Sequence, residues 1–226
     1  MMPAVQMPPT WQRVLTTGMT EYSLADWLAR LETLHPKEIE LGLERVAVVA
    51  NRLQLLPVAV PVITVAGTNG KGSVVGAVEA LVTHKGLRAG VCTSPHLLRF
   101  NERIRVAGED ASDADIVAAF AEIEAARGEV SLTYFEFATL AALLVFRQQA
   151  VDIVVLEVGL GGRLDAVNIV DPSVAVITSI ALDHEAWLGN NLDGIAREKA
   201  GILRRSTPAV IACTDVPEGL REAVVE

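Results

Sequence analysis

The residues best suited to chemistry lie in one short segment, Gly-Thr-Asn-Gly-Lys-Gly-Ser, which runs from Gly67 to Ser73. An apolar, β-branched run at 61–66 precedes it, and apolar residues at helical spacing follow it as far as Gly86. The glycines allow backbone N–H groups to gather around an anion, and the positive end of the following helix dipole points at the same place. Lys71 adds a charge that can reach the outer phosphates of a nucleotide. The segment therefore predicts a phosphate-binding loop between a strand and a helix.

The spacing of this segment departs from the general P-loop pattern. Two residues separate Gly67 from the Gly70-Lys71 pair, where the general pattern has a longer spacer. Gly72 also occupies the position directly after the lysine, where the pattern has the Ser or Thr that binds the metal. An ordinary glycine turn is the alternative, but such a turn needs neither so many glycines nor an Asn and a Lys.

Further polar segments directly follow predicted strands, namely Ser94–His96, Glu157–Asp165 and Asp183–His184. Ligands of parallel sheets bind at the carboxyl ends of the strands, so these segments and the glycine loop should converge on one crevice. Glu157 ends an apolar run, and a buried carboxylate is costly unless it meets a cation. That cation can be a metal ion or the partner in an internal salt bridge. The pattern therefore predicts a site at this edge of the sheet.

Strands and helices alternate along the chain, and this order positions the crevice. The predicted strands carry continuous Val and Ile runs and lie at 61–66, 88–94, 151–159, 173–180 and 208–213. The predicted helices lie at 23–35, 38–55, 73–86, from Ser112 onward, 133–149 and 191–203, and residues 95–106 are expected to form a loop. The order predicts an α/β fold with a mostly parallel β-sheet flanked by helices, similar to the P-loop NTPases.

Composition limits the classes of protein to which the chain can belong. Its 226 residues are 51% hydrophobic, which allows a substantial core, yet no apolar run reaches the ~18 residues of a membrane helix. The N-terminus lacks a basic region followed by an apolar one, so we expect no secretory signal. A net charge of −9 disfavours a nucleic-acid binder but leaves room for a nucleotide site. Cys92 and Cys213 fit reduced core residues of a cytoplasmic protein.

Several long motifs follow one another along the chain: VAGTNGKGS, TSPHL, FNERIRV, LEVGLGGRLDA and TSIALDH, with LHPKEIELGLERV before them and REKAGI after them. Together they resemble the folylpolyglutamate synthase/dihydrofolate synthase family of the Mur ligase superfamily, from about Leu24 to Cys213. Proteins of that family are longer and carry a second, C-terminal α/β domain that completes the ATP site and holds the incoming glutamate. The resemblance implies an N-terminal extension at 1–22 and an incomplete ATP-binding domain at 23–226.

The resemblance also implies an activity, that of an ATP-dependent ligase with Mg²⁺ at two sites. Such an enzyme adds L-glutamate to dihydropteroate, and to the glutamate of tetrahydrofolate, through an acyl phosphate that the amine attacks. It is expected to be a cytoplasmic monomer with no nucleic-acid or membrane partner, and the isolated chain is expected to lack turnover. A Mur-type peptidoglycan ligase is an alternative within the same class, and an inactive nucleotide- or pterin-binding fragment is an alternative from another class.

By the same resemblance, particular residues take particular roles. The ATP-binding residues are Thr68, Asn69, Gly70, Lys71, Gly72 and Ser73. The metal ligands are Ser94, Glu157 and His184, and the catalytic residues are Lys71, His184 and Lys199, the last carbamylated by CO₂. The dihydropteroate-binding residues are Pro36, Lys37, Glu38, Ile39, Thr133, Tyr134, Phe135, Glu136, Leu164, Asp165 and Ala166.

Several of these residues have a plain structural alternative. Ser94 can be a turn or cap residue before Pro95, and a lone histidine such as His184 is more often structural than a ligand. Carbamylation needs a neutral amine, hence a pKa lowered by burial or by nearby cations, whereas Lys199 can instead be an exposed helix lysine. Phe135 suits stacking on a flat pterin but can instead pack in the core.

The segment Gly159-x-Gly161 offers a different reading, because a strand followed by such glycines begins a dinucleotide fingerprint. Its sixth position is Leu164 rather than Gly or Ala, and no clear helix follows. NAD binding is therefore disfavoured, and the segment is assigned to the pterin pocket by the resemblance.

Overall fold

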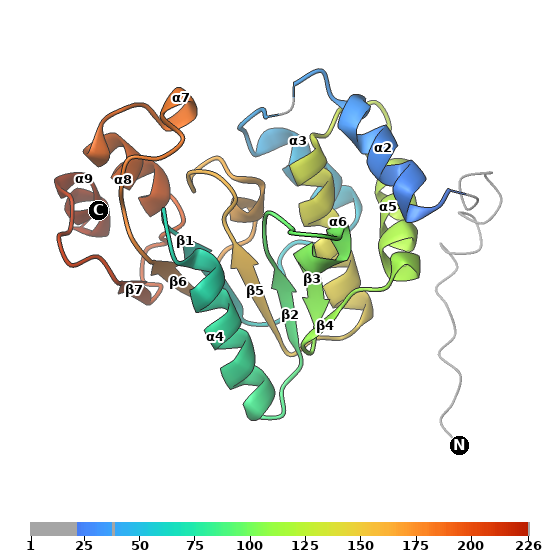
Figure 1. Ribbon diagram of the computed structural model, residues 1–226, viewed down its shortest axis with the longest axis horizontal. Helices are drawn as coiled ribbons and strands as arrows, with labels where there is room; N and C mark the ends of the chain where they lie inside the picture. The colour runs from blue at the N-terminus through green and yellow to red at the C-terminus, as the bar shows by residue number, and fades with distance from the viewer. Residues whose placement is uncertain (1–21, 38, 226) are drawn as a thin grey trace.

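The computed structural model describes residues 22–37 and 39–225, which form a seven-stranded sheet with helices on both faces (Figure 1). The strands follow the order β4-β3-β2-β5-β1-β6-β7. The parallel strands are β1 (Val62–Ala66), β2 (Ala89–Cys92), β5 (Ile153–Glu157), β6 (Val174–Ile177) and β7 (Ala209–Ile211). Each of them lies within a predicted strand, so the predicted α/β fold with a mostly parallel sheet is confirmed.

Strand β1 has parallel neighbours on both sides, β5 and β6. In this register Val65 of β1 lies opposite both Glu157 and Val176, so the ends of the three strands are level. The chain leaves β1 through α4 (Lys71–His84) and enters β2, which lies beyond β5. Connections that diverge in this way leave a crevice at the carboxyl ends of the strands, which is where ligands of such sheets bind.

The segment at 95–106 is more ordered than the sequence suggests. A 3₁₀ helix, η1 (Phe100–Arg103), leads into β3 (Ile104–Val106), which pairs antiparallel with β2 and with β4 (Glu109–Asp110). The prediction of a loop therefore holds at 95–99 but was wrong from Phe100 onward. A three-residue strand is too short to show a period of two, and the signal lies in the turn after it. Ala107 and Gly108 both have positive φ, at 54° and 89°, as hairpin turns require.

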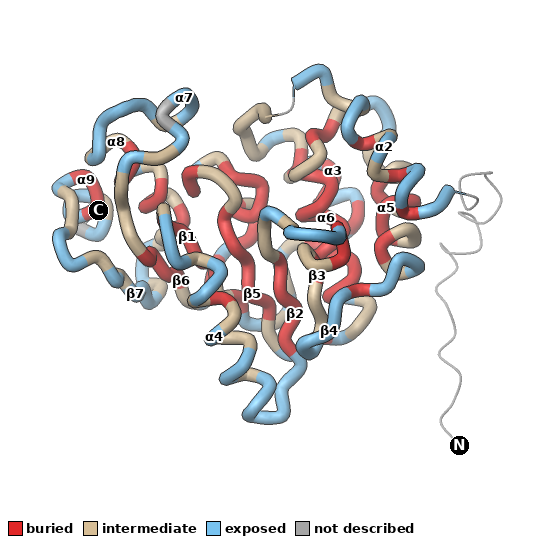
Figure 2. Tube along the Cα trace, viewed as in Figure 1, coloured by how far each residue is buried: buried red, intermediate tan, exposed pale blue. Residues whose placement is uncertain are grey.

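One face of the sheet is covered by a cluster of four helices: α2 (Leu24–Leu34), α3 (Glu44–Arg52), α5 (Asp113–Arg127) and α6 (Tyr134–Gln148). Helix α6 contacts β2 and β3 as well as the other three helices, so most of its residues are buried (Figure 2). The prediction that this helix is deeply buried is confirmed. Trp27, Phe120 and Phe137 pack as tilted or edge-to-face rings between these helices, in geometries that favour aromatic pairs.

The other face of the sheet packs against α4, whose Val75 joins the apolar side chains of β1, β2, β5 and β6. Beyond β6 lie the short helix α7 (Glu185–Leu188) and the packed pair α8 (Leu192–Ala200) and α9 (Glu218–Val225) (Figure 1). In the part of the chain that the structure describes, no helix is both long enough and apolar enough to cross a membrane.

Helix starts follow their capping residues. Ser23, Ser112 and Thr133 accept the N–H groups of residues 26, 115 and 136, which confirms the predicted starts at these positions. The predicted helix at 38–55 begins later, at Glu44, so that prediction was wrong at its start. Gly42 has φ 152° and donates its N–H to the Leu164 carbonyl 3.3 Å away, which holds the preceding residues outside the helix. Residues 1–21 of the predicted extension at 1–22, and Glu38, lie outside the described residues.

Candidate active site at the carboxyl ends of the strands

The glycine loop is held by the segment that follows β6. The Thr68 N–H donates to the Ser179 carbonyl at 2.7 Å, and the Asn69 N–H donates to the Ser179 hydroxyl at 3.0 Å. The Thr178 hydroxyl donates to the Asn69 carbonyl at 2.7 Å. A Cβ on Gly67, whose φ is 148°, would lie 1.9 Å from the Thr178 hydroxyl oxygen, so only glycine fits there. The sequence analysis missed these supporting residues, although a Thr-Ser pair directly after an apolar strand was the available signal.

Lys71 opens helix α4 and folds back over the loop. Gly70, in the left-handed conformation with φ 85°, occupies the N-cap position before it. The Lys71 ammonium donates to the carbonyl oxygens of Gly67 and Thr68 at 3.0 and 3.3 Å. The first turn of α4 carries no acidic side chain, so its free N–H groups and Lys71 leave an electropositive end for an anion. This is the arrangement predicted for the phosphate-binding loop.

The structure brings Ser94 and Glu157 together beside this loop. The Glu157 side chain is only 6% exposed, and its carboxylate accepts one long bond, 3.4 Å, from the Ser94 N–H. Burial raises the pKa of Glu157, while the Ser94 N–H and the charges of Lys71 and Arg105 act in the opposite direction. No ion pair to Glu157 occurs among the described residues, which contradicts the internal salt bridge offered as its alternative. A buried and weakly satisfied carboxylate next to a phosphate-type loop suits a cation.

Lys199 lies on the inner side of α8 and is 2% exposed. Its ammonium donates to the Gly67 carbonyl at 3.1 Å, so the alternative of an exposed helix lysine is wrong. Burial lowers the pKa of Lys199 to about 8, helped by the charge of Lys71 and opposed by Asp183 and Asp165. This lysine therefore has the property that carbamylation requires, an amine that loses its proton easily.

His184 reaches the same region, but within the described part of the chain its side chain forms no hydrogen bond or ion pair with Ser94 or Glu157. Its imidazole is 50% exposed and lies 3.6 Å from the Asp183 carboxylate. The residue has φ 48°, a conformation that is uncommon outside glycine and is often found at functional sites. His184 and Ser94 line the same cavity, whereas Glu157 does not line it, so the structure brings together only two of the three predicted metal-ligating residues there.

That cavity holds about 240 Å³ and contains most of the predicted pterin-binding residues. The predicted residues that line it are Ile39, Thr133, Phe135, Glu136, Leu164, Asp165 and Ala166. An adjoining cleft of about 650 Å³ shares Ile39 and Phe135 with the cavity and is also lined by Pro36, Lys37 and Tyr134. The structure thus divides the predicted pocket into two spaces, with Phe135 on the wall between them.

The two buried carboxylates of this cavity, Glu136 and Asp165, already accept hydrogen bonds from other groups of the protein. Glu136 accepts the Thr133 N–H at 2.7 Å and an Arg45 N–H at 3.1 Å, so it completes a capping box and an ion pair. The Asp165 carboxylate accepts backbone N–H groups at distances of 2.8 to 3.0 Å, from Gly159, Leu160 and Val167. Burial raises the pKa of Asp165 to about 6 despite these bonds. Both residues therefore shape the walls of the cavity.

The glycines after β5 do not open a dinucleotide-binding helix. The segment from Gly159 is tied to the Asp165 carboxylate and leads only into a short 3₁₀ helix, η2 (Ala166–Ile169). A Cβ on Gly159 would lie 2.9 Å from the Phe135 ring, so glycine is needed there to let the aromatic ring reach the cavity wall. This geometry agrees with the sequence argument against NAD.

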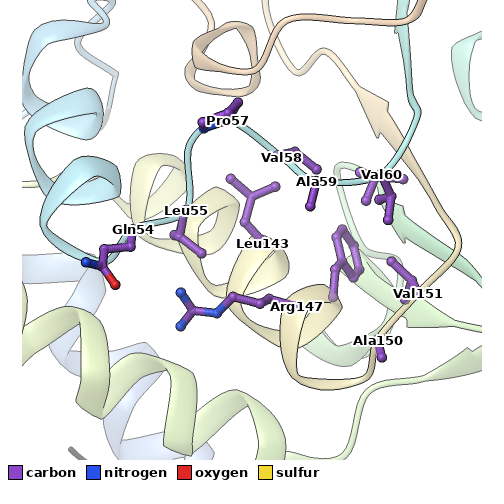
Figure 3. A pocket seen from close by; sticks show the side chains of 12 residues that line it. Gln54, Leu55, Pro57, Val58, Ala59, Val60, Leu143, Arg147, Ala150 and Val151 are labelled. Carbon is purple, nitrogen blue, oxygen red and sulfur yellow. The ribbon is translucent and has the colours of Figure 1, made fainter.

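A separate cavity of about 340 Å³ lies away from these residues (Figure 3). Its lining comes from the connection at 54–60, the last part of α6 and the residues that enter β5. The lining is apolar apart from Gln54 and Arg147, and the Arg147 guanidinium already binds the Leu53 carbonyl and Glu122. None of the predicted site residues lines this cavity.

Comparison with known proteins agrees with this geometry. The Mur ligase middle domain model matches residues 65–223. Two dihydrofolate synthase/folylpolyglutamate synthases are similar, from Escherichia coli at 54% identity over 203 residues and from Haemophilus influenzae at 53% over 195. The alignments cover 90% and 86% of this chain but 48% and 44% of those proteins, so the chain spans about half the length of the curated relatives it matches.

Solved structures give the same result. E. coli FolC in complex with DHPP and ADP superposes with a TM-score of 0.90 at 52% identity, covering 92% of this chain and 50% of that one. A bifunctional folylpolyglutamate synthase/dihydrofolate synthase with Mn, AMPPNP and L-glutamate bound superposes with a TM-score of 0.86 at 54% identity, covering 93% and 51%. The chain that folds around this loop, its two lysines and Glu157 belongs to the family of Mur ligase middle domains.

Proposed function

We propose that this chain is the ATP-binding half of an amide ligase that adds L-glutamate to dihydropteroate and to the glutamate of tetrahydrofolate. The observation that carries the proposal is the buried Glu157 carboxylate, placed with Ser94 between the glycine loop and an aromatic-walled cavity. Relatives at 54% and 53% identity carry the name of that activity. The cavity beside the loop supports a pterin-linked acid as a second substrate in addition to the nucleotide.

The loop from Thr68 to Ser73 would hold the phosphates of ATP. Lys71 now donates to two backbone carbonyls, and it can exchange these for phosphate oxygens without moving its backbone. Ser179 holds the Thr68 and Asn69 N–H groups and Thr178 holds the Asn69 carbonyl before any ligand arrives, so the remaining N–H groups of the loop, from Gly70 onward, need little reorganisation.

Mg²⁺ fits the donor set next to this loop. Glu157 and Ser94 offer oxygen ligands, and magnesium commonly binds one or two protein oxygens together with phosphate oxygens and water. His184, which lines the same cavity as Ser94, is our candidate ligand for a second ion that is bound mainly through phosphate. When bound, the metal supplies positive charge against the transferring phosphoryl oxygens.

The reaction would run in two steps. A substrate carboxylate oxygen attacks the γ-phosphorus while the bond to ADP breaks, which gives an acyl phosphate; the glutamate amine then attacks the acyl carbon and phosphate leaves. Lys71 would offset the charge of the phosphoryl group, and the loop amides would hold it in line. Phe135 would stack on the pterin and keep the carboxylate at the Ser94 end of the cavity.

Lys199 would be carbamylated. Its neutral amine attacks CO₂, forms an N–C bond and releases a proton, which leaves a carbamate anion in place of a buried cation. The charge of Lys71, which shares the Gly67 carbonyl with Lys199, would then face a negative partner instead of a positive one. Carbamylation thus removes a repulsion at the phosphate end of the site.

We assign residues 23–226 to one ATP-binding domain preceded by an extension at 1–22. The chain spans about half of its curated relatives, so we assign turnover to a protein that also contains their remaining half. We infer a cytoplasmic monomer, which is consistent with two free cysteines, one of them buried.

The test measures binding by the 226-residue chain and turnover by a protein that contains both halves. We expect AMPPNP to bind the chain in the presence of Mg²⁺, and Lys71→Ala to weaken this binding at least about tenfold. Lys85→Ala, an exposed lysine at the other end of α4, is the matched control and should leave the affinity unchanged.

Turnover is then measured with dihydropteroate, tetrahydrofolate and a UDP-muramyl substrate in separate assays. ADP release that depends on the two pterins and on glutamate supports the proposal. Release with the UDP-muramyl substrate alone would assign the protein to peptidoglycan synthesis instead. Nucleotide binding without turnover of any substrate by the two-halved protein would reduce the assignment to a binding module.

A further inference from the structure

The cleft beside the substrate cavity contains an arginine that no site assignment above uses. Arg103 lines this cleft together with His96, Tyr134 and Lys37. His96 lies two residues after Ser94 in the chain, so their Cα atoms are at most about 7 Å apart. The cleft and the substrate cavity share Phe135 and Ile39, so one ligand can extend from one space into the other.

The Arg103 guanidinium is held rigidly in this cleft. Its Nε donates to His96 Nδ1 at 2.7 Å. Its Cζ lies 5.9 Å from the Phe100 ring centroid and 5.6 Å from the Tyr134 ring centroid, within the range of cation–π contacts. Phe100 in turn packs edge-on against Tyr134 and His96. The side chain is therefore ordered before any ligand binds, which reduces the entropy that binding must overcome.

The two outer nitrogens of Arg103 make no hydrogen bond or ion pair with the described residues. Other half-buried arginines differ: Arg105 pairs with Glu79 at 2.6 Å, and Arg127 pairs with Glu124 at 2.7 Å. Glu32 also lines the cleft but is exposed at its rim, and Lys37 on the same rim pairs with Glu40. A fixed guanidinium fork with free donors matches the geometry of a carboxylate.

We propose that Arg103 determines specificity by binding the carboxylate through which a glutamyl substrate does not react. The inference rests on the proposed function and deepens it. Dihydropteroate has one carboxylate, which must lie near Ser94 to be phosphorylated. A glutamyl substrate carries a second one on the same residue, and the Arg103 cleft adjoins that position. Arg103 therefore serves the extension of glutamyl substrates and leaves the first addition unaffected.

The experiment uses the 226-residue chain and three pterin ligands. These are dihydropteroate, tetrahydrofolate and a tetrahydrofolate analogue in which 4-aminobutyrate replaces glutamate, so that only the non-reacting carboxylate is missing. We expect wild type to bind tetrahydrofolate about tenfold or more tightly than the analogue, as the loss of a charge-assisted hydrogen bond implies. Arg103→Gln should abolish this preference and leave the affinities for the analogue and for dihydropteroate unchanged. Arg103→Lys should retain part of it.

Arg99→Gln is the matched control, because Arg99 lies in the same loop, is 67% exposed on its side chain and does not line the cleft. Equal affinity of wild type for tetrahydrofolate and the analogue overturns the inference without any variant, even if Arg103→Gln fails to fold. An Arg103→Gln variant that weakens all three ligands equally overturns it too, because the arginine would then only support the pocket. A wild-type chain that binds AMPPNP but none of the pterins overturns the proposed function itself.

Discussion

Lys71 and Lys199 donate hydrogen bonds to the same acceptor, the carbonyl oxygen of Gly67, at N–O distances of 3.0 and 3.1 Å. Two ammonium groups that converge on one buried oxygen repel each other, and burial disfavours the charge on Lys199 further. This relationship makes the two lysines unequal, since Lys71 stays at the loop surface and Lys199 is enclosed.

Stability should depend on the protonation of Lys199. Its pKa is about 8 in the fold against 10.5 for a free lysine, so between these values the unfolded chain binds more protons than the folded one. The free energy of unfolding should therefore rise with pH across this window, by a total on the order of 3 kcal/mol. Denaturant unfolding at several pH values, compared with Lys199→Met, checks this. A variant curve parallel to that of wild type would contradict the depressed pKa, and Lys85→Met serves as the exposed control.

Lys199 should also take up CO₂. The neutral fraction of the amine grows as pH rises toward its pKa of about 8, so carbamate formation in ¹³C-bicarbonate should increase over the same range. A carbamate carbon signal in the NMR spectrum of wild type, absent from Lys199→Met, is the expected result. A spectrum that shows no such signal at pH 8.5 would remove the carbamate from the mechanism.

Glu157→Gln should weaken Mg²⁺-dependent nucleotide binding without lowering the stability of the fold. Burial raises the pKa of this carboxyl, so its charge is a burden on the fold and the amide should leave thermal stability unchanged or slightly higher. Binding of AMPPNP should lose its dependence on Mg²⁺, with a loss of affinity of about tenfold or more. Calorimetric titration with and without the metal measures this. Glu109→Gln, at an exposed strand edge, is the control, and retained Mg²⁺ dependence in Glu157→Gln would exclude the carboxylate as a ligand.

Gly67→Ala should destabilise the protein by more than about 2 kcal/mol, because its Cβ would lie 1.9 Å from the Thr178 hydroxyl in a backbone conformation with φ 148°. Gly76→Ala, in the interior of α4 with nothing within 4 Å of the added carbon, should instead stabilise by about 0.5–1 kcal/mol. Urea unfolding of the two variants gives the comparison. Similar effects of both alanines would mean that the contact with Thr178 does not restrain the loop.

The sequence predicted those parts of the fold that local chemistry specifies. Continuous Val and Ile runs identified the parallel strands, and Ser23, Ser112 and Thr133 marked helix starts through their side-chain hydrogen bonds. The loop with Lys71, and Glu157 at the end of a strand, indicated the candidate site from local sequence alone. The meeting of Ser94 with Glu157 followed from the rule that parallel strands end at one edge.

What could not be predicted depends on contacts between distant segments. The start of α3 is set by a bond from Gly42 to Leu164, which lies 122 residues away in sequence. Arg103 lies in the 3₁₀ helix η1 and contacts the ring of Tyr134, the first residue of α6, and no local spacing in the sequence predicts this contact. The sequence also could not show that the Asp165 carboxylate accepts backbone N–H groups. An acidic residue in a loop suggests a ligand-binding role whether or not its carboxylate is already hydrogen-bonded.

The hydrogen bonds of Thr178 and Ser179 to Asn69 join segments about 110 residues apart in sequence, and they give a glycine loop shorter than the general pattern a defined shape. The curvature of this loop depends on hydrogen bonds to the segment that follows the neighbouring strand β6. Its shape is thus a property of the assembled sheet, and a peptide that carries Gly67–Ser73 alone should have no affinity for phosphate.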